Sequence, residues 1–481
     1  MKKNYLKLMT YLFAAIVCVG FVSCGGDDND NDDPGTPSNP ITPVDPSDNN
    51  VMTSADQKEY LEKVAMSFMN MMPASDFRDI ADLGKYIADT YNGDYNWGNV
   101  EEWSRDAFDA AREALGTKTT ESEVESWGSY TYKYNYIYTN YKAVLLASNF
   151  TGHFTASNGG WIQENANDLQ FIFTDSQGRK CVLKLETGGS VKKVYLVNVD
   201  NWQSRDYDSN GYYYTYNYYY NRTQCVIGIP ERIVVTLTQG GSQVVKTSIN
   251  INLGSITNEE FDISRNSLTL STLVELNNGY KINVSNVSYT ANTKASVAFT
   301  MTKNGTALVT IGASSDVYDI PSVNVSAFSS KSFDADNYDF DKINGKNAFV
   351  KLDIIGKVQI QGTLSDIRKF VDYLNEASRN KKTESNFKSY INQANSLANV
   401  NLFYDGKNVK QASIKLEPFA YEDKWNGSTY WKAEPVICFY DGSSYSTFEA
   451  FFNEKDFKKV IDTFKALVDN YADLIGERVD W

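Results

Sequence analysis

The chain of 481 residues contains a single histidine, His153, and only five cysteines. One histidine excludes metal sites built from several imidazoles, and it leaves one candidate base for a serine or cysteine nucleophile. Apart from the two cysteines near the N-terminus, only Cys181, Cys225 and Cys438 remain. Three cysteines form at most one disulfide, so this is not a scaffold held together by disulfides.

The short motifs that mark common enzyme sites are also missing. The sequence contains no GxSxG, no P-loop, no HExxH and no CxxC. Carboxylate pairs such as glycosidases use leave no local motif, because the two acids come from distant parts of a chain. We therefore expect that the protein is not an enzyme, with a carboxylate-based hydrolase as an alternative.

Positive charge and long hydrophobic runs are scarce as well. The chain has 46 Lys and Arg against 60 Asp and Glu, which gives a formal net charge of −14. An acidic surface repels phosphate backbones, so nucleic acid is not an expected partner. The mostly apolar run from Leu8 to Val22 has about 15 residues, whereas a membrane-spanning helix needs about 20.

This apolar run follows Lys2, Lys3 and Lys7 and leads to Phe21-Val22-Ser23-Cys24. A basic head, a short apolar segment and a small residue at its end are the parts of a secretory signal. With a cysteine directly after the small residue, the segment resembles a bacterial lipoprotein signal. That resemblance implies lipidation at Cys24, which becomes the first residue of the mature protein. The alternative is an ordinary cleaved signal.

Residues 24–50 are acidic, rich in proline and free of Lys and Arg. Such a segment buries little apolar surface, so we expect a disordered tether. The acidic cluster of Asp27, Asp28 and Asp30 directly after Cys24 resembles the export signal of Bacteroides-type surface-exposed lipoproteins. The resemblance implies an outer-membrane protein that is anchored by lipid and faces outwards. The alternative is a spacer on a lipoprotein that faces the periplasm.

Helical periodicity opens and closes the body of the chain. A capping-box spacing at Ser54 and Gln57 predicts a helix that ends at Pro73. A second helix is predicted from Ser75, and a third from Asn99 to a stop at Gly116. A helical pair is predicted with starts at 363–366 and at Thr383. The last helix follows an Asn453 cap and places Phe464 in the middle of its apolar stripe, as a core residue.

Between these helices the apolar residues alternate with polar ones, which is typical of strands. Turn residues predict five hairpins, at 175–178, 240–241, 304–305, 405–406 and 441–442. Hairpins with short turns favour antiparallel strands rather than β–α–β units.

These patterns predict an α+β fold, with an N-terminal helical segment and large antiparallel β-sheets covered by helices. The predicted organisation is a signal peptide over 1–23, a tether over 24–50, a helical segment over 51–120, a β-rich region over 121–345 and an α+β region over 346–481.

Two rows of alternating tyrosines suggest a binding surface. The first runs from Tyr130 to Tyr138, and on a strand each row lines one face. Tyrosine rings stack on sugar rings, so the second row is a candidate glycan platform. A structural aromatic ladder across paired strands is the alternative, and the first row also fits a helix. The candidate platform residues are Tyr212, Tyr214, Tyr216, Tyr218 and Tyr220.

The second row is preceded by Asp206, Asp208 and Asn210, and Asn217 stands at the twelfth position. This spacing matches the start of a calcium-binding loop, but the expected final Glu is missing. Calcium is therefore a candidate cofactor at these four residues, with a plain hairpin turn as the alternative. A second acidic stretch, 334–341, lacks the glycine of the pattern and is interpreted as a solvated loop.

Three classes of function follow. The first is a non-catalytic surface lipoprotein with a binding or structural role toward a glycan, a host molecule or an envelope protein. The second is a carrier of apolar ligands, by analogy with curved antiparallel sheets that helices cover. The third is the carboxylate-based hydrolase.

Overall fold

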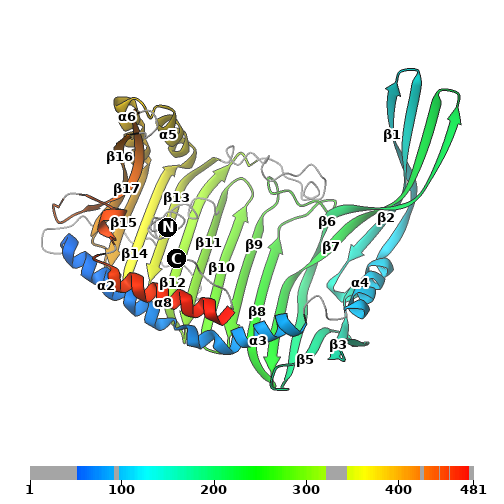
Figure 1. Ribbon diagram of the computed structural model, residues 1–481, viewed down its shortest axis with the longest axis horizontal. Helices are drawn as coiled ribbons and strands as arrows, with labels where there is room; N and C mark the ends of the chain where they lie inside the picture. Colours follow the sequence, from blue (N-terminus) through cyan, green and yellow to red (C-terminus); the bar gives the residue numbers. More distant parts are fainter. Residues whose placement is uncertain are drawn as a thin grey trace.

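The computed structural model describes residues 51–91, 97–320, 344–422, 427–443, 445–453 and 455–475. The predictions at Cys24, at Asp27, Asp28 and Asp30, and at 334–341 lie outside these residues. Within them, no helix combines the length and hydrophobicity needed to cross a membrane. The protein is mostly β-sheet, with helices along one face (Figure 1).

The helices begin near the predicted caps. Thr53 caps α2, since its Oγ accepts a hydrogen bond from the Asp56 N–H, and Asp366 caps α5 in the same way. Thr383 precedes α6 as predicted. The helical elements are α2 (Ser54–Met71), η1 (Ala74–Phe77), α3 (Arg78–Thr90), α4 (Gly98–Ala110), η2 (Ala147–Asn149), α5 (Ile367–Arg379), α6 (Glu384–Leu397), α7 (Phe448–Phe451) and α8 (Lys458–Ile475).

All 18 strands belong to one sheet. They are β1 (Arg112–Trp127), β2 (Tyr130–Leu145), β3 (Gly152–Ser157), β4 (Gly160–Glu164), β5 (Leu169–Thr174), β6 (Lys180–Asn210), β7 (Tyr213–Gln239), β8 (Ser242–Leu253), β9 (Leu268–Leu276), β10 (Tyr280–Thr290), β11 (Lys294–Lys303), β12 (Thr306–Tyr318), β13 (Asn344–Ile354), β14 (Val358–Asp366), β15 (Ala398–Tyr404), β16 (Ala412–Glu422), β17 (Thr429–Phe439) and β18 (Ser446–Thr447).

Most strands pair antiparallel with their neighbours in the sequence, and the predicted hairpins account for several of these pairs. At the β11–β12 turn, Asn304 and Gly305 both have positive φ, which is the conformation that an Asn-Gly hairpin requires. Two pairs are parallel, β2 with β7 and β3 with β5. The sheet is therefore mixed rather than purely antiparallel, which corrects the sequence-based expectation.

Two further corrections concern local structure. The predicted helix beyond Ala110 is a strand, β1, because Arg112–Trp127 pairs with β2 and this pairing overrides local helix propensity. The predicted second strand after 441–442 is mostly helix. Only two residues form β18, after which Phe448 and Phe451 are buried one turn apart on α7.

The body of the molecule is the curved part of the sheet from β8 to β18, and its inner face is the face that α2 covers. One straight row of directly opposed residues crosses this face. At one end the row is buried under α2 and α7; at the other end its residues are half-exposed. The row consists of Ile249, Thr272, Val284, Phe299, Ile311, Leu352, Ile360, Leu402, Ala412 and Phe439.

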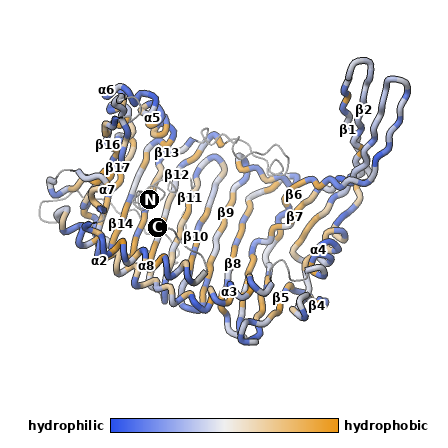
Figure 2. Tube along the Cα trace, in the orientation of Figure 1, coloured by the Kyte–Doolittle hydropathy of each residue, from blue (hydrophilic) through white to orange (hydrophobic). Residues whose placement is uncertain are grey.

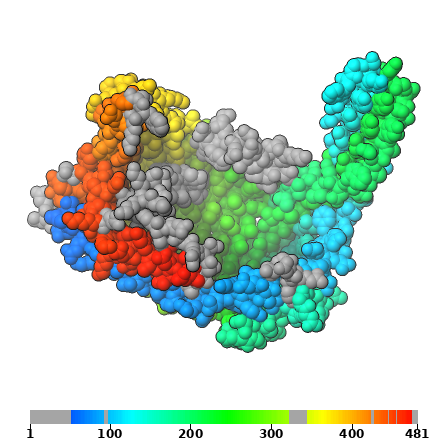
Figure 3. Space-filling model, in the orientation of Figure 1, coloured from blue at the N-terminus to red at the C-terminus, as the bar shows by residue number. Residues whose placement is uncertain are grey.

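The strands of the body carry most of the hydrophobic residues, as Figure 2 shows. Helix α8 packs on α2 through Met69, Phe457 and Val460, and α3 covers the sheet around Phe173 and Cys181. Beside these helices, the surface over the strands of the body forms a hollow (Figure 3).

The longest strands leave the body and form an arm. We define the arm as residues 118–140 of β1 and β2 and residues 198–222 of β6 and β7. Its strand order is β1, β2, β7, β6, and the β2–β7 contact joins two separate hairpins. The arm projects away from the body, and none of the helices in the described part of the chain covers it (Figure 1).

Candidate functional site

The parallel pairing of β2 with β7 places the two tyrosine rows side by side. Tyr132 lies opposite Tyr214, and the same register continues along both strands. All these rings therefore lie on one face of the arm, which we call the ladder face. The first row is thus a strand and not the alternative helix. The ladder face contains Tyr132, Tyr134, Tyr136, Tyr138, Tyr214, Tyr216, Tyr218 and Tyr220.

Opposed rings stack on one another across the two strands. The ring centroids of Tyr132 and Tyr214 are 5.2 Å apart with an angle of 16° between the planes, and Tyr134 with Tyr216 and Tyr136 with Tyr218 are similar. In each stacked pair, the facing sides of the two rings contact each other and are not available to a ligand, and such pairs stabilise a sheet. This geometry favours the structural ladder over the glycan platform for the inner rings. Their edges and hydroxyl groups remain on the surface.

Below the ladder, the same face opens into a cleft of about 450 Å³ between the arm and the loop from residue 255 to residue 266. We call it the base-of-arm cleft. Arg222 and Gln224 continue the β7 row beyond Tyr220, and Asn198 lies opposite Gln224 on β6. The lining residues are Leu115, Thr117, Thr119, Asn140, Tyr141, Tyr195, Asn198, Arg222, Gln224, Asn258 and Glu260.

Arg222 is the fixed charge of this cleft. Its guanidinium lies 3.4 Å from the centre of the Tyr138 ring. It donates two hydrogen bonds to Asp200, of 3.0 and 3.1 Å, and one of 2.8 Å to Glu121. Burial alone would lower the pKa of Arg222, but these hydrogen bonds together outweigh it and hold the pKa above its ordinary value. A guanidinium has five N–H groups, so two have no protein partner among the described residues.

A short loop forms the opposite wall. The carboxylate of Asp262 is buried and accepts hydrogen bonds from the Ser264 N–H and from Arg265, which holds the loop in shape. Glu259 attaches the loop to the arm: its carbonyl accepts from the Tyr195 N–H, and its carboxylate pairs with Lys142 at 2.6 Å. Asn258 and Glu260 are thereby held over the cleft.

Three amide side chains face this cleft without a protein partner among the described residues: Asn198, Gln224 and Asn258. Trp202 lies further along the ladder face, four residues from Asn198 on β6 and opposite Tyr220, and its side chain is 62% exposed. Amides both donate and accept hydrogen bonds, and an exposed indole offers an apolar face. The cleft is therefore suited to a ligand that has many hydroxyl groups and an apolar flank.

The backbone at the predicted calcium ligands differs from that of a calcium-binding loop. Asp206, Asp208 and Asn210 lie on β6 and Asn217 lies opposite Asp206 on β7, so they do not form a loop. An EF-hand loop wraps its ligands around one ion, whereas these four residues lie along two paired strands. Asn217 instead donates a 2.7 Å hydrogen bond to Asp206. Among the described residues, no group of three or more His, Cys, Asp or Glu is placed to hold a metal ion.

The single histidine and the three described cysteines do not line the base-of-arm cleft. The ring of His153 is 2.7 Å from Asp168 in the short strands beside the arm. Cys181, Cys225 and Cys438 are all free thiols. Burial raises the pKa of Cys181 and of Cys225, which makes them poor nucleophiles at neutral pH.

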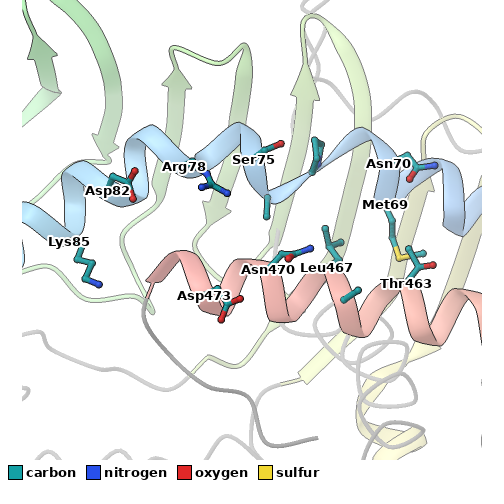
Figure 4. A pocket seen from close by; sticks show the side chains of 13 residues that line it. Met69, Asn70, Ser75, Arg78, Asp82, Lys85, Thr463, Leu467, Asn470 and Asp473 are labelled. Carbon is teal, nitrogen blue, oxygen red and sulfur yellow. The ribbon is translucent and has the colours of Figure 1, made fainter.

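A second groove, of about 600 Å³, runs between α3 and α8. Figure 4 shows that side chains of α2 also line this space, among them Met69, which lies across from Leu467 and Asn470 of α8. Arg78, Asp82, Lys85 and Asp473 lie along it, so its charges are mixed and no single ligand class is favoured.

The sequence contained a signal for the ladder that periodicity alone missed. Residues 130–138 and 212–220 repeat the same alternation with an asparagine at the same place, and Asn135 donates a 2.8 Å hydrogen bond to Asn217 in the structure. By contrast, the cleft residues come from four strands and a loop and carry no local motif. Comparison of the chain with protein families, with curated proteins and with solved structures finds no match.

Proposed function

We propose that the protein is a non-catalytic, lipid-anchored surface protein that binds a neutral glycan in the base-of-arm cleft. The observation that carries the proposal is the set of unpartnered amides around a fixed guanidinium, with an exposed indole further along the same face. Sugars present hydroxyl groups in the ring plane and C–H groups on the ring faces. The amides and Arg222 match the hydroxyl groups, and Trp202 matches a ring face.

The charge of the cleft indicates a neutral sugar rather than an acidic one. Glu121 and Asp200 already pair with Arg222, and Glu260 adds a further carboxylate. A uronic acid or a sulfated sugar would meet these carboxylates without an unpaired cation to balance its charge. The tyrosine hydroxyl groups along the ladder face extend the polar surface outwards, so the ligand is an extended chain rather than a single sugar.

The direct test is affinity gel electrophoresis and titration calorimetry with a panel of neutral and acidic polysaccharides. Trp202→Ala and Gln224→Ala should each weaken binding, the first by at least about tenfold because a central aromatic contact is lost. Tyr213→Ala is the matched control, since Tyr213 is equally exposed but lies on the opposite face of the arm. Equal loss in the control, or no binding by the wild type, would refute the proposal.

A second candidate function is the carriage of an apolar ligand on the inner face of the body. It is favoured by the half-exposed end of the apolar row, at Ile249, Val284 and Phe299. Displacement of a fluorescent fatty acid measures this directly, and Phe299→Asp should reduce binding if the ligand lies there. Trp202→Ala should leave fatty-acid binding unchanged, which separates the two candidates.

A further inference from the structure

One edge of the arm is an open strand. β1 pairs with β2 along one side only, and among the described residues no strand pairs with its other side. Every residue from Glu113 to Trp127 is exposed. An edge strand presents unpaired backbone N–H and C=O groups, and these can pair with a strand from another chain.

The two free edges of the arm differ in regularity. Within the arm, the pairing of β6 with β7 is interrupted by a register shift at 202–204, and two further shifts, at 188–191 and 195–197, lie on the part of β6 outside the arm. Such bulges twist an edge and prevent it from accepting another strand. β1 has one shift, between Ala114 and Lys118, and from there to Trp127 its register with β2 is unbroken. The regular edge is therefore on β1, and it spans residues 118–127.

This edge is also accessible. The arm projects from the body and carries β1 on its outside (Figure 1). At about 3.3 Å per residue the regular stretch is about 33 Å long. Roughly half of its backbone groups point away from β2, so an added strand finds a row of donors and acceptors along its full length.

The side chains of this edge are acidic, so they favour a partner strand with positive charge. Glu121, Glu123 and Glu125 alternate along the ladder face, and Thr120, Ser122 and Val124 alternate on the other face. Glu121 pairs with Arg222. Glu123 and Glu125 have no ion-pair partner among the described residues and receive only long hydrogen bonds, from Tyr136 at 3.4 Å and from Trp127 at 3.5 Å.

A second copy of this chain is poorly suited to pair with the edge of β1. Antiparallel self-pairing of β1 about Glu123 would place glutamates opposite glutamates, and like charges directly opposite are destabilising. Pairing of β1 with the arm edge of β6 in another copy would meet the bulge at 202–204. The charge pattern fits a strand that alternates Lys or Arg with small or β-branched residues.

From the open regular edge and its charge pattern, we infer that β1 receives an extended basic segment of another protein as an added strand. The backbone of residues 118–127 pairs with that segment. Glu123 and Glu125 pair with alternate Lys or Arg side chains on the ladder face. The partner is therefore a protein, and this site lies apart from the glycan cleft of the proposed function.

The test uses a fluorescently labelled short peptide that alternates Lys and Thr, with a peptide of the same composition in which all Lys come first. The alternating peptide should bind more tightly by about tenfold, because only its charges match the spacing of the glutamates. Hydrogen exchange followed by mass spectrometry should show new protection within residues 118–127. Binding without this protection, or equal binding of both peptides, would overturn the inference.

Charge reversal gives a matched pair of variants. Glu125→Lys should weaken binding of the alternating peptide and permit binding of one that alternates Glu and Thr. Asp208→Lys is the control, since Asp208 is an exposed acid near the same end of the arm but on β6. Glu121 is left unchanged because it holds Arg222. An equal effect of both reversals would reduce the interaction to general electrostatic attraction and overturn the added strand.

Discussion

The body and the arm are parts of one sheet, but they are stabilised in different ways. In the body, α2 and α7 bury an apolar face, and the side chains there have the low exposure of a protein core. In the arm, no helix among the described residues covers either face, and most tyrosines are only half-buried. The arm depends on ring stacking, on ion pairs such as Arg222 with Asp200, and on backbone pairing. Burial per residue is the larger stabilising term, so the arm should unfold locally before the body does.

The largest expected effect comes from truncating a ring in the body. Phe451 is 2% exposed and contacts the rings of Phe439 and Phe457. Phe451→Ala should lower the free energy of unfolding by about 3–5 kcal/mol, which calorimetry or denaturant melts would measure.

Phe464→Ala serves as the comparison for that variant. The apolar stripe of α8 predicts a core position for Phe464, but the structure leaves it half-buried against the cluster of Met69, Phe457 and Val460. Its truncation should therefore cost less than that of Phe451. If the two variants melt alike, burial does not govern the stability of the body.

A smaller effect is expected in the arm. Tyr132→Ala and Tyr214→Ala remove one stacked pair, and a double-mutant cycle should give a coupling of about 0.5–1.5 kcal/mol. Hydrogen exchange should report this as faster opening of the arm, while the melting temperature of the body stays the same. A cooperative loss of the whole fold would show that arm and body are one unit.

The short strands β3 to β5, which lie at the end of β6 away from the arm, offer a test by pH. A hydrogen bond from Gln170 and another from His153 lower the pKa of Asp168 to about 2, below its ordinary value of 3.8. Because the folded pKa is the lower one, Asp168 stabilises the fold above about pH 4, and this contribution is lost as the pH falls through about 2. Asp168→Asn should flatten that part of the stability curve. An unchanged acid profile would contradict the assignment.

The smallest effect is expected at the end of the arm. Trp127 is 70% exposed, so Trp127→Ala should change the free energy of unfolding by less than about 0.5 kcal/mol. A larger loss would mean that this indole stabilises the fold although it is exposed. The contrast between arm and body would then be weaker.

The sequence predicted the parts of this fold that depend on nearby residues. Asn304 and Gly305 specify their own turn, and Thr383 marks the start of α6 without help from elsewhere in the chain. The parts that depend on distant partners were missed. Ala114 reads as helix, and only β2 makes it a strand. The polar residues 198–210 have no apolar alternation, so β6 becomes a long strand only because β7 lies beside it.

The base-of-arm cleft shows the same division. Tyr214, Tyr216, Tyr218 and Tyr220 lie on one face of β7 as predicted, whereas Tyr212 lies in the turn before it. Stacking against Tyr132 to Tyr138 changes what that face offers. The cleft joins Asn198, Gln224 and Asn258, which are brought together by hairpin pairing and by the buried carboxylate of Asp262. No short-range pattern encodes that juxtaposition.

The hydrogen bond between Asn135 and Asn217 has a consequence for how the arm assembles. Tyrosines recur at every second position on both strands, so a slip of two residues still places rings opposite rings. The stacking energy hardly distinguishes the native alignment from its slipped neighbours. The asparagines do, because a slip of two residues separates the two amides and places Asn217 opposite Lys133 or Ile137. Asn135 and Asn217 thus favour one register of β2 against β7, where the tyrosines alone would allow several registers of nearly equal energy.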